Sequence, residues 1–413
     1  MRPLPHDRSP DSTLALVFDG YEFISKRCEH YQSNAFQARL LLRPHICMRG
    51  AEAASVFYDP ERFERQDAAP ARVKKTLFGE GGVQGMDGDA HRHRKEMFMS
   101  LMTPEGVQRL ADLTAQHWTA AMDRWEQQEK VALLPAVEEI LTRAVCEWAG
   151  VPLEESEVGQ RAREFTAMID SPGAIGLRHW QGRRARSRNE AWVRGIISYT
   201  RATGADGTAL AAIALHRDTD GDLLDEQVAA VELINVLRPT VAIARYITFA
   251  ALALHEHPEF RPALTDGGAA EAERFVQEVR RFYPFFPFVA ARVRREFDWQ
   301  GYRFPQGTRT LLDLYGTNHD PRSWDDPEAF RPDRFRDWDG SAFNFIPQGG
   351  GDHYLQHRCP GEWITIAVLK AAVDMLTRRM RYDVPEQDLR VPLSKMPTAP
   401  KSGFVIANVR RAP

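Results

Sequence analysis

The chain has 413 residues, of which 43% are hydrophobic and 27% are charged, and this composition excludes a disordered or fibrous protein. Its 54 Lys and Arg residues and 57 Asp and Glu residues give a formal net charge of −3, which provides no general attraction to nucleic acid or anionic lipid. The four cysteines lie far apart with no CxxC pair, which argues against a disulfide scaffold and favours a reducing cytoplasm.

The length would suggest two or three domains at roughly 150 residues each. However, no repeat or Ser/Gly linker divides the sequence, so we expect one domain over residues 1–413. The first 20 residues are polar and proline-rich, and we expect neither a signal peptide nor a membrane anchor.

Local signals predict mostly helix with a smaller share of strand. Residues 1–85 mix short β-like runs with turns, and helical periodicity dominates from there to about residue 282. Within that region Thr103-Pro104-Glu105 predicts a helix start, with a hydroxyl cap followed by a proline and an acid. Short alternating runs after Val289 predict a small sheet, and the tail from Trp363 returns to helix before ending in short strands. We expect a mainly α fold with a minor β portion.

The longest predicted helix runs from Asp225 to His255, and its 31 residues would span about 46 Å. Its stretch from residue 228 to 254 is apolar, but Glu232, Asn235, Arg238 and Arg245 interrupt it, which favours a buried helix of a soluble protein over a membrane span. Pro239 lies in the middle and predicts a kink that leaves carbonyl groups free to face a ligand.

A glycine-rich loop, Phe345-Ile-Pro-Gln-Gly-Gly-Gly-Asp-His-Tyr-Leu-Gln-His-Arg-Cys359-Pro-Gly-Glu, delivers one cysteine to a helix predicted to start near Pro360. The N-terminus of a helix stabilises a thiolate, and an isolated thiolate in such a loop suits axial ligation of haem iron. Two alternatives remain open. Cys359 could be a small buried hydrophobic residue, or His353, His357 and Cys359 could bind zinc, although no fourth ligand lies at a convincing spacing.

Glu278 and Arg281 share one helix face at a spacing of i, i+3, and Arg334 follows in the segment Phe-Arg-Pro-Asp-Arg-Phe. One buried carboxylate between two guanidinium groups would hold that segment against the helix, which makes these three residues structural candidates. The alternative for the helical pair is a solvated surface pair.

The order of these features resembles the cytochrome P450 superfamily. The segments FIPQGGGDHYLQHRCPGEW, VQGMDGDAHRHRK, ELINVLRPTVAI, FVQEVRRFYPFFPF and LDLYGTNHDP resemble its bacterial fatty-acid peroxygenase branch, which is related to the olefin-forming fatty-acid decarboxylases. The Cys loop departs from the usual pattern FxxGxRxCxG, because Phe345 precedes Cys359 by fourteen residues and position 357 is His. The resemblance implies haem b with Cys359 as the axial ligand, and a long kinked distal helix above it.

Monooxygenases of the superfamily resemble one another in an acid followed by a threonine on the distal helix. Here the corresponding stretch carries Arg238 and Pro239, so the proton relay for O₂ activation is missing and H₂O₂ is the expected oxidant. We expect Arg238 to bind a fatty-acid carboxylate, which would serve as the acid–base group and would place the α and β carbons nearest the iron. The alternative for Arg238 is an internal salt bridge, for instance to Glu232 or Asp313.

Other candidate residues follow from the same resemblance. Asn235 lies on the helix face of Arg238 and is expected to orient it or a water molecule, with a plain buried amide as the alternative. Gln84 resembles a distal position that is glutamine in hydroxylating members and histidine in members favouring decarboxylation, so it favours hydroxylation; the alternative is a turn amide.

The haem propionates and the acyl chain need their own contacts. His91 and Lys95, one helical turn apart, are predicted to contact the propionates, together with Arg65 and Arg292, whereas Arg92 and Arg94 are as readily explained as a solvated helix end. Phe78 and Phe288 are predicted to contact the substrate, and Phe285 and Phe286 to line the channel or pack in the core. The run Arg183, Arg184, Arg186 and Arg188 is expected on a solvated face.

The sequence therefore predicts a cytoplasmic haem-thiolate peroxygenase that hydroxylates long-chain fatty acids at the α or β carbon with H₂O₂, with some decarboxylation to terminal alkenes. It predicts no redox partner and no nucleic acid. The alternatives are a reductase-dependent fatty-acid monooxygenase and, more remotely, a zinc or lipid-binding protein without catalysis.

Overall fold

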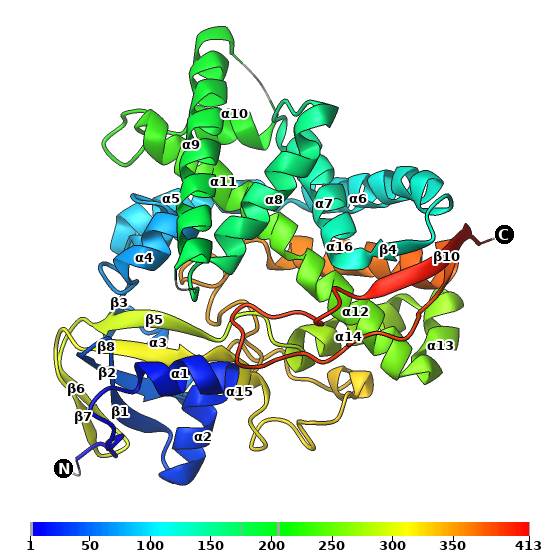
Figure 1. The fold of residues 1–413 in the computed structure, drawn as a ribbon. Helices are drawn as coiled ribbons and strands as arrows, with labels where there is room; N and C mark the ends of the chain where they lie inside the picture. The colour runs from blue at the N-terminus through cyan, green and yellow to red at the C-terminus, as the bar shows by residue number, and fades with distance from the viewer. Residues whose placement is uncertain (1–2, 175, 205–206, 413) are drawn as a thin grey trace.

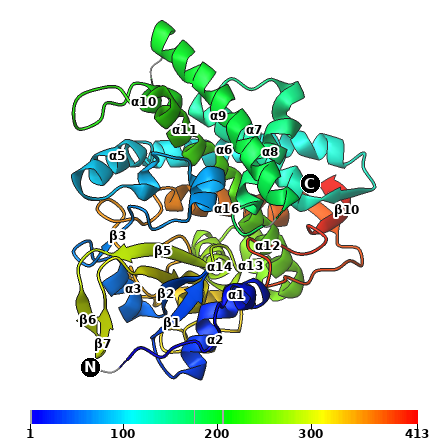
Figure 2. The ribbon, with the colours of Figure 1, turned by 60° about the vertical axis from the view of Figure 1, so that its left-hand side comes forward.

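A computed structural model describes residues 3–174, 176–204 and 207–412. The chain forms a large helical region and a smaller β region, and the two lie on opposite sides of the molecule in both ribbon views (Figures 1 and 2). The described chain begins at the β region and ends at the far side of the helical region. This arrangement confirms the predicted mainly α fold with a minor β portion.

The main sheet combines strands from both ends of the sequence. Its strand order is β1-β2-β8-β5-β3, in which β2 and β8 pair in parallel and the other neighbours are antiparallel. The strands are β1 (Ala35–Leu40), β2 (Arg43–Met48), β3 (Phe63–Glu64), β5 (Phe288–Val293) and β8 (Arg309–Asp313). A hairpin of β6 (Phe297–Trp299) and β7 (Tyr302–Phe304) and a second sheet of β4 (Lys130–Ala132), β10 (Val405–Arg411) and β9 (Met380–Asp383) complete the β structure. The strands predicted after residue 289 and in the tail are confirmed.

The prediction of only strands and turns in residues 1–85 is wrong, because short helices also form there. They are α1 (Thr13–Asp19), α2 (Phe23–His30), α3 (Ala51–Phe57) and α4 (Ala71–Val73), with single turns at Gly20–Glu22, Lys74–Phe78 and Val83–Gly85. Helices this short show little periodicity and are stabilised by tertiary packing, such as the burial of Phe23 and Phe57.

All the remaining helices except α15 build the larger region. They are α5 (Gly88–Ser100), α6 (Pro104–Trp125), α7 (Leu133–Ala149), α8 (Val158–Asp170), α9 (Leu177–Thr203), α10 (Ala209–Ala214), α11 (Glu226–Ala242), α12 (Ala244–Glu256), α13 (Arg261–Thr265), α14 (Ala269–Phe282) and α16 (Glu362–Asp374). The short α15 (Leu314–Asn318) follows β8 and packs against β5 and the turn at Gly20–Glu22. The start of α6 is confirmed, since the Thr103 side chain accepts a hydrogen bond from the backbone of Gly106.

The long helix predicted around Pro239 is two helices, and the interruption lies at Ile243 rather than at the proline. Helical structure continues through Pro239 because only one ladder hydrogen bond is lost there. The Thr240 hydroxyl then donates to the Val236 carbonyl at 2.9 Å, a contact that bends helices, and the Ile243 N–H bonds the Thr240 carbonyl in a tighter turn.

Helices α11 and α16 lie in the interior and position the candidate site. Helix α11 packs against α7, α8, α9 and α10, and α16 packs against α6, α12 and α14. The stretch from Glu226 to Glu256 is long and apolar enough to cross a membrane, but 94% of its most apolar window is buried inside the protein, as in a core helix. Polar side chains on α11 are therefore held in an apolar interior, where each needs a partner.

Candidate functional site

The Cys loop brings a half-buried cysteine to the start of α16. The Cys359 N–H donates to the Gln348 carbonyl at 3.2 Å, and the Gln348 side-chain nitrogen lies 3.8 Å from Sγ. Gly349 has a φ of +94°, and a Cβ at Gly350 would lie 2.7 Å from the carbonyl oxygen of Ala342. The glycines therefore let the loop fold tightly around the cysteine.

Cys359 has positively charged and N–H groups among its neighbours. Burial raises the pKa of its thiol, whereas the Gly361 N–H, Lys95 and Arg280 act in the opposite direction. Arg280 also pairs with Glu362 in the first turn of α16. The Gly361 N–H, Lys95 and Arg280 thus favour the thiolate, the form that ligates a metal, while burial and the Glu362 charge oppose it by raising the thiol pKa.

The two histidines of the loop each have partners other than the cysteine. His353 lies 2.9 Å from Glu362 and stacks on Trp363, while His357 packs against the His91 ring in a tilted arrangement. Within the described residues, no group of three or more His, Cys, Asp or Glu side chains could hold a metal ion. The geometry thus gives no support to a zinc site, and Cys359 stands as a single soft ligand.

Two of the four residues predicted to contact the propionates, Lys95 and His91, contact this loop directly. Lys95 donates to the carbonyls of Gln356 and Arg358 at 2.6 and 2.5 Å, and the ring centroids of His91 and His357 are 3.9 Å apart. Burial lowers the pKa of His91 to about 4 and that of Lys95 to about 8.

Arg65 and Arg292 differ from one another. Arg65 is buried, packs over Phe57 and donates to the Ala290 carbonyl at 2.6 Å. Arg292 lies 3.3 Å from Glu64, and its side chain is 40% exposed. Arg65 is therefore held inside the protein, while Arg292, on β5 between β8 and β3, has a partly exposed side chain.

Arg238 is buried on α11 without an acidic partner in the described part of the chain. Its Nη2 lies 3.4 Å from the Asn235 side-chain oxygen, and its Nε has no hydrogen-bond partner there. Burial, followed by the nearby charge of Arg186, lowers the pKa of Arg238 to about 9. A buried guanidinium in this condition is costly unless an anion binds to it.

The two acids considered as partners for Arg238 are engaged elsewhere. Glu232 pairs with Arg94, and Asp313 accepts a hydrogen bond from Ser25 at 2.6 Å. The internal salt bridge is therefore not the arrangement found, and Arg238 is available to an anionic ligand.

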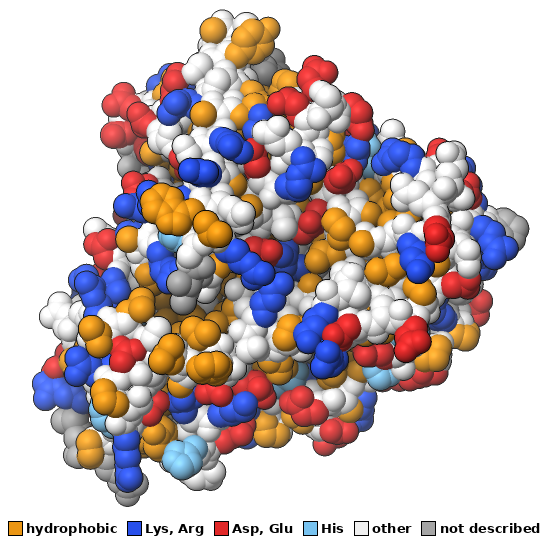
Figure 3. Space-filling view, viewed as in Figure 1, with side chains coloured by type: hydrophobic (Ala, Val, Ile, Leu, Met, Phe, Trp, Pro, Cys, Tyr) orange, Lys and Arg blue, Asp and Glu red, His pale blue; other side chains and the backbone are white. Residues whose placement is uncertain are grey.

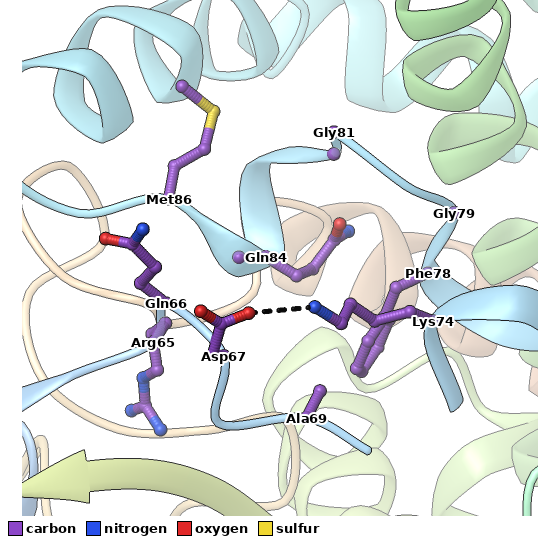
Figure 4. A pocket seen from close by; sticks show the side chains of 12 residues that line it. Arg65, Gln66, Asp67, Ala69, Lys74, Phe78, Gly79, Gly81, Gln84 and Met86 are labelled. Carbon is purple, nitrogen blue, oxygen red and sulfur yellow. Dashed lines mark hydrogen bonds and ion pairs between the residues drawn. The ribbon is translucent and has the colours of Figure 1, made fainter. Parts of the chain in front are cut away.

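Gln84 and Phe78 line one cavity of about 120 Å³ formed by residues 65–69 and 74–86. Figure 4 shows both side chains on the same side of it, next to the ion pair of Asp67 and Lys74. The Gln84 side-chain oxygen also accepts a hydrogen bond from Asn235 at 3.2 Å. A polar contact thus connects the cavity wall with Arg238 on α11.

Phe288 is not among the residues that line this cavity. It begins β5 and packs, partly buried, against the hydrophobic cluster that includes Phe23 and Phe36. Phe285 stacks on Tyr246, with ring centroids 4.2 Å apart. In the space-filling view the surface is hollowed between β5 and the lower end of α9, where hydrophobic side chains gather (Figure 3).

Arg186, expected on a solvated face, is instead buried, and so is Arg94, for which a solvated helix end was one alternative. Arg94 is 2% exposed and bonds Glu232 and Asp218, and Arg186 is 3% exposed, pairs with Glu190 and donates to the Leu77 carbonyl. The sequence did not show the role of Arg94 because both of its partners lie more than a hundred residues away. The available signal for Arg94 was Glu232 itself, since a carboxylate inside an apolar helix needs a cation.

Glu278, Arg281 and Arg334 lie together in the interior. The Glu278 carboxylate accepts two hydrogen bonds from Arg281, at 2.7 and 2.8 Å, and one from Arg334 at 3.2 Å. It also accepts the backbone N–H of Arg331 at 2.8 Å. The carboxylate therefore joins α14 to the turn that contains Pro332–Phe335.

The residues present fit a haem group between α11 and the Cys loop. Cys359 supplies one soft ligand, and a Cβ on Gly361 would be 3.9 Å from its sulfur, which is ordinary contact. Arg65 and Lys95 are buried cations, and His91 is a buried imidazole beside the loop whose lowered pKa keeps it neutral.

Comparisons with known proteins agree with this geometry. The family model described as Cytochrome P450 matches residues 272–407. Curated plant cytochromes P450 from Mentha species are 31–34% identical over the matched part, but this chain spans only 22–28% of their length.

Solved structures match over almost the full length. Cytochrome P450SP alpha (CYP152B1) in complex with (R)-ibuprofen is 54% identical, with a TM-score of 0.95, and the match covers 97% of this chain and 99% of that one. Cytochrome P450EX alpha (CYP152N1) with myristic acid is 47% identical, with a TM-score of 0.97 and 100% of both chains covered. A variant of cytochrome P450 OleT in complex with arachidonic acid is 37% identical, with a TM-score of 0.97, and the match covers 100% of this chain and 99% of that one.

Proposed function

Because the chain belongs to the cytochrome P450 family, we propose that it is a haem-thiolate peroxygenase that uses H₂O₂ to hydroxylate long-chain fatty acids at the α or β carbon. The observation that carries the proposal is Arg238, a buried guanidinium with no acidic partner in the described residues. The structures of similar proteins with myristic and arachidonic acid support a fatty acid as the anion.

Cys359 would hold the haem iron through its sulfur, and Arg65, His91 and Lys95 would contact the propionates. Once bound, the haem supplies the activation of peroxide oxygen for insertion into a C–H bond. The Gln348 side chain, 3.8 Å from the sulfur, and the N–H of Gly361 stabilise the negative charge on Cys359.

Arg238 would bind one or both oxygens of the fatty-acid carboxylate and hold it in the interior. The carboxylate then lies where it can accept a proton from one peroxide oxygen and return it to the other, so the substrate completes the catalytic group. Because the head group is fixed at Arg238, the α and β carbons are the parts of the chain closest to it.

Helix α11 carries no acid directly before Thr240 that would form the acid–threonine pair used for O₂ activation. Arg238 and Pro239 occupy the positions before Thr240, and the Thr240 hydroxyl donates its hydrogen bond to the Val236 carbonyl at 2.9 Å. This arrangement favours peroxide over the reductase-dependent alternative. Because the long apolar stretch is buried and peroxide replaces external electrons, we also propose a cytoplasmic protein that needs no redox partner.

Peroxide alone is expected to drive turnover. Purified holoprotein with myristic acid and H₂O₂, and with no reductant or electron-transfer protein added, should form hydroxymyristic acid. The product, resolved by chromatography and mass spectrometry, should carry the hydroxyl at the α or β carbon. A requirement for NAD(P)H and an electron-transfer protein would contradict the proposal, as would hydroxylation near the methyl end.

Replacing Gln84 with His is expected to increase the share of terminal alkene among the products. The Gln84 amide cannot titrate, whereas an imidazole near pH 7 can accept or donate a proton next to Arg238. The measurement is the ratio of alkene to hydroxy acid from one saturated fatty acid. Gln84→Leu serves as the control, since it removes the amide without adding a titrating group, and an equal increase there would assign the effect to shape.

A further inference from the structure

Glu232 is a fully buried carboxylate in the middle of α11. One of its oxygens accepts the backbone N–H of Val83 and Nη1 of Arg94, both at 2.9 Å. The other oxygen accepts Nδ2 of Asn235 at 3.0 Å. The carboxylate therefore contacts the loop that carries Gln84 and the helix that carries Arg238.

These contacts determine how the Asn235 amide is oriented. A carboxylate only accepts hydrogen bonds, so the NH₂ group of Asn235 must face Glu232 and its oxygen must face away. The same NH₂ group lies 3.2 Å from the Gln84 oxygen, and the Asn235 oxygen lies 3.4 Å from Nη2 of Arg238. If the Asn235 amide were reversed, its NH₂ group would face the N–H groups of Arg238, and no hydrogen bond could form between them.

We propose that Glu232 is a positioning residue that, through the Asn235 amide, orients both Arg238 and Gln84 for binding the fatty-acid carboxylate. This inference rests on the proposed function, because it assigns to Arg238 the role of anchor. Glu232 and Arg238, both in the described part of the chain, share no hydrogen bond or ion pair. The influence of Glu232 on Arg238 therefore passes through Asn235, which bonds both.

Arg94 explains how the carboxylate is kept in this apolar position. Its guanidinium bonds Glu232 on one side and Asp218 on the other, at 2.6 and 2.7 Å, and Asp218 is partly exposed. Burial raises the pKa of Glu232, while the hydrogen bonds from Asn235, Arg94 and Val83 act in the opposite direction. Glu232 thus also joins α5 to α11, and the experiment must separate this structural contribution from positioning.

A double-mutant cycle separates the two contributions. Glu232→Gln keeps the shape but presents a group that both donates and accepts, so the Asn235 amide is no longer fixed. Myristate would be titrated into the haem-loaded protein and followed by the change in haem absorption, for the wild type, Glu232→Gln, Asn235→Ala and the double variant. We expect Glu232→Gln to weaken myristate binding about tenfold, as for a lost hydrogen bond to a charged group. When Asn235 is already alanine, adding Glu232→Gln should weaken myristate binding by less than about twofold.

Asp218→Asn is the matched control, since it weakens the hold on Arg94 without touching Asn235. Its myristate affinity should stay within about twofold of the wild type. Equal losses from Glu232→Gln in both backgrounds, no loss in either, or the same loss from Asp218→Asn would overturn the proposal. If Glu232→Gln does not take up haem, Glu232→Asp, which keeps the charge for Arg94 but retracts it from Asn235, enters the cycle with the same expectations.

The failure of the proposed function has a different signature. In that case the wild-type protein itself would show no spectral response to myristate and no turnover with peroxide. A wild type that binds myristate, together with a variant that binds it equally well, rejects only the role of Glu232.

Discussion

Arg238→Ala is expected to lower kcat/KM for myristic acid with H₂O₂ by about a thousandfold. Truncating one partner of a buried, hydrogen-bonded charge pair costs about 2–5 kcal/mol, and here the same change also displaces the group proposed to move the peroxide proton. The loss should therefore appear in kcat as well as in KM. Steady-state kinetics with varied myristic acid at fixed peroxide measure both terms.

The haem environment should survive this substitution. Arg238 has no acidic partner among the described residues, so its removal leaves no buried carboxylate unpaired. The absorption spectrum of the reduced carbon-monoxide complex should match that of the wild type. Arg238→Lys is the informative control, because it keeps a charge but loses the planar fork, and we expect an intermediate activity. Unchanged turnover in Arg238→Ala would remove substrate-assisted catalysis from the proposal.

The sequence predicted those parts of the fold that depend on neighbouring residues. The capped start of α6 at Thr103 and the short strands after Val289 both follow from a few adjacent side chains, and both are confirmed. The sequence predicted a kink at Pro239, whereas the structure interrupts the helix at Ile243. Pro239 removes only one hydrogen bond, and the interruption follows from the Thr240 side chain and the tight turn after it.

The candidate site shows the same division. Arg238 could be selected from the sequence because a guanidinium in an apolar helix needs an anion, and because the family resemblance places Arg238 and Pro239 where an acid and a threonine are usual. The surroundings of Arg238 could not be predicted. They include Glu232, whose hydrogen bonds to Val83 and Arg94 join residues 149 and 138 positions apart in the sequence. A basic run such as His91-Arg92-His93-Arg94-Lys95 has the same local pattern whether it faces solvent or a buried acid; only the tertiary structure shows that Arg94 faces Glu232.

Glu278→Ala is expected to lower the free energy of unfolding by about 3–5 kcal/mol, because it leaves the guanidinium groups of Arg281 and Arg334 buried without their anion. Both arginines also donate to backbone carbonyls, but those bonds do not neutralise their charge. Since α14 and the turn at Pro332–Phe335 are joined through this carboxylate, the loss should also reduce haem retention. Urea denaturation and the haem content of the purified protein measure the two effects.

Glu273→Gln on the same helix is the matched control for Glu278→Ala. Glu273 pairs with Lys370 at 3.1 Å, and both side chains are about 40% exposed, so solvent screens the pair. Exposed pairs of this kind contribute about 0–1 kcal/mol. Glu273 and Glu278 each pair with a cation, but only Glu278 is buried. If burial rather than pairing causes the destabilisation, the loss in free energy of unfolding should be severalfold larger for Glu278→Ala than for Glu273→Gln. Similar losses from both variants would show that Glu278 contributes no more than a surface pair, and the structural role proposed for it would have to be abandoned.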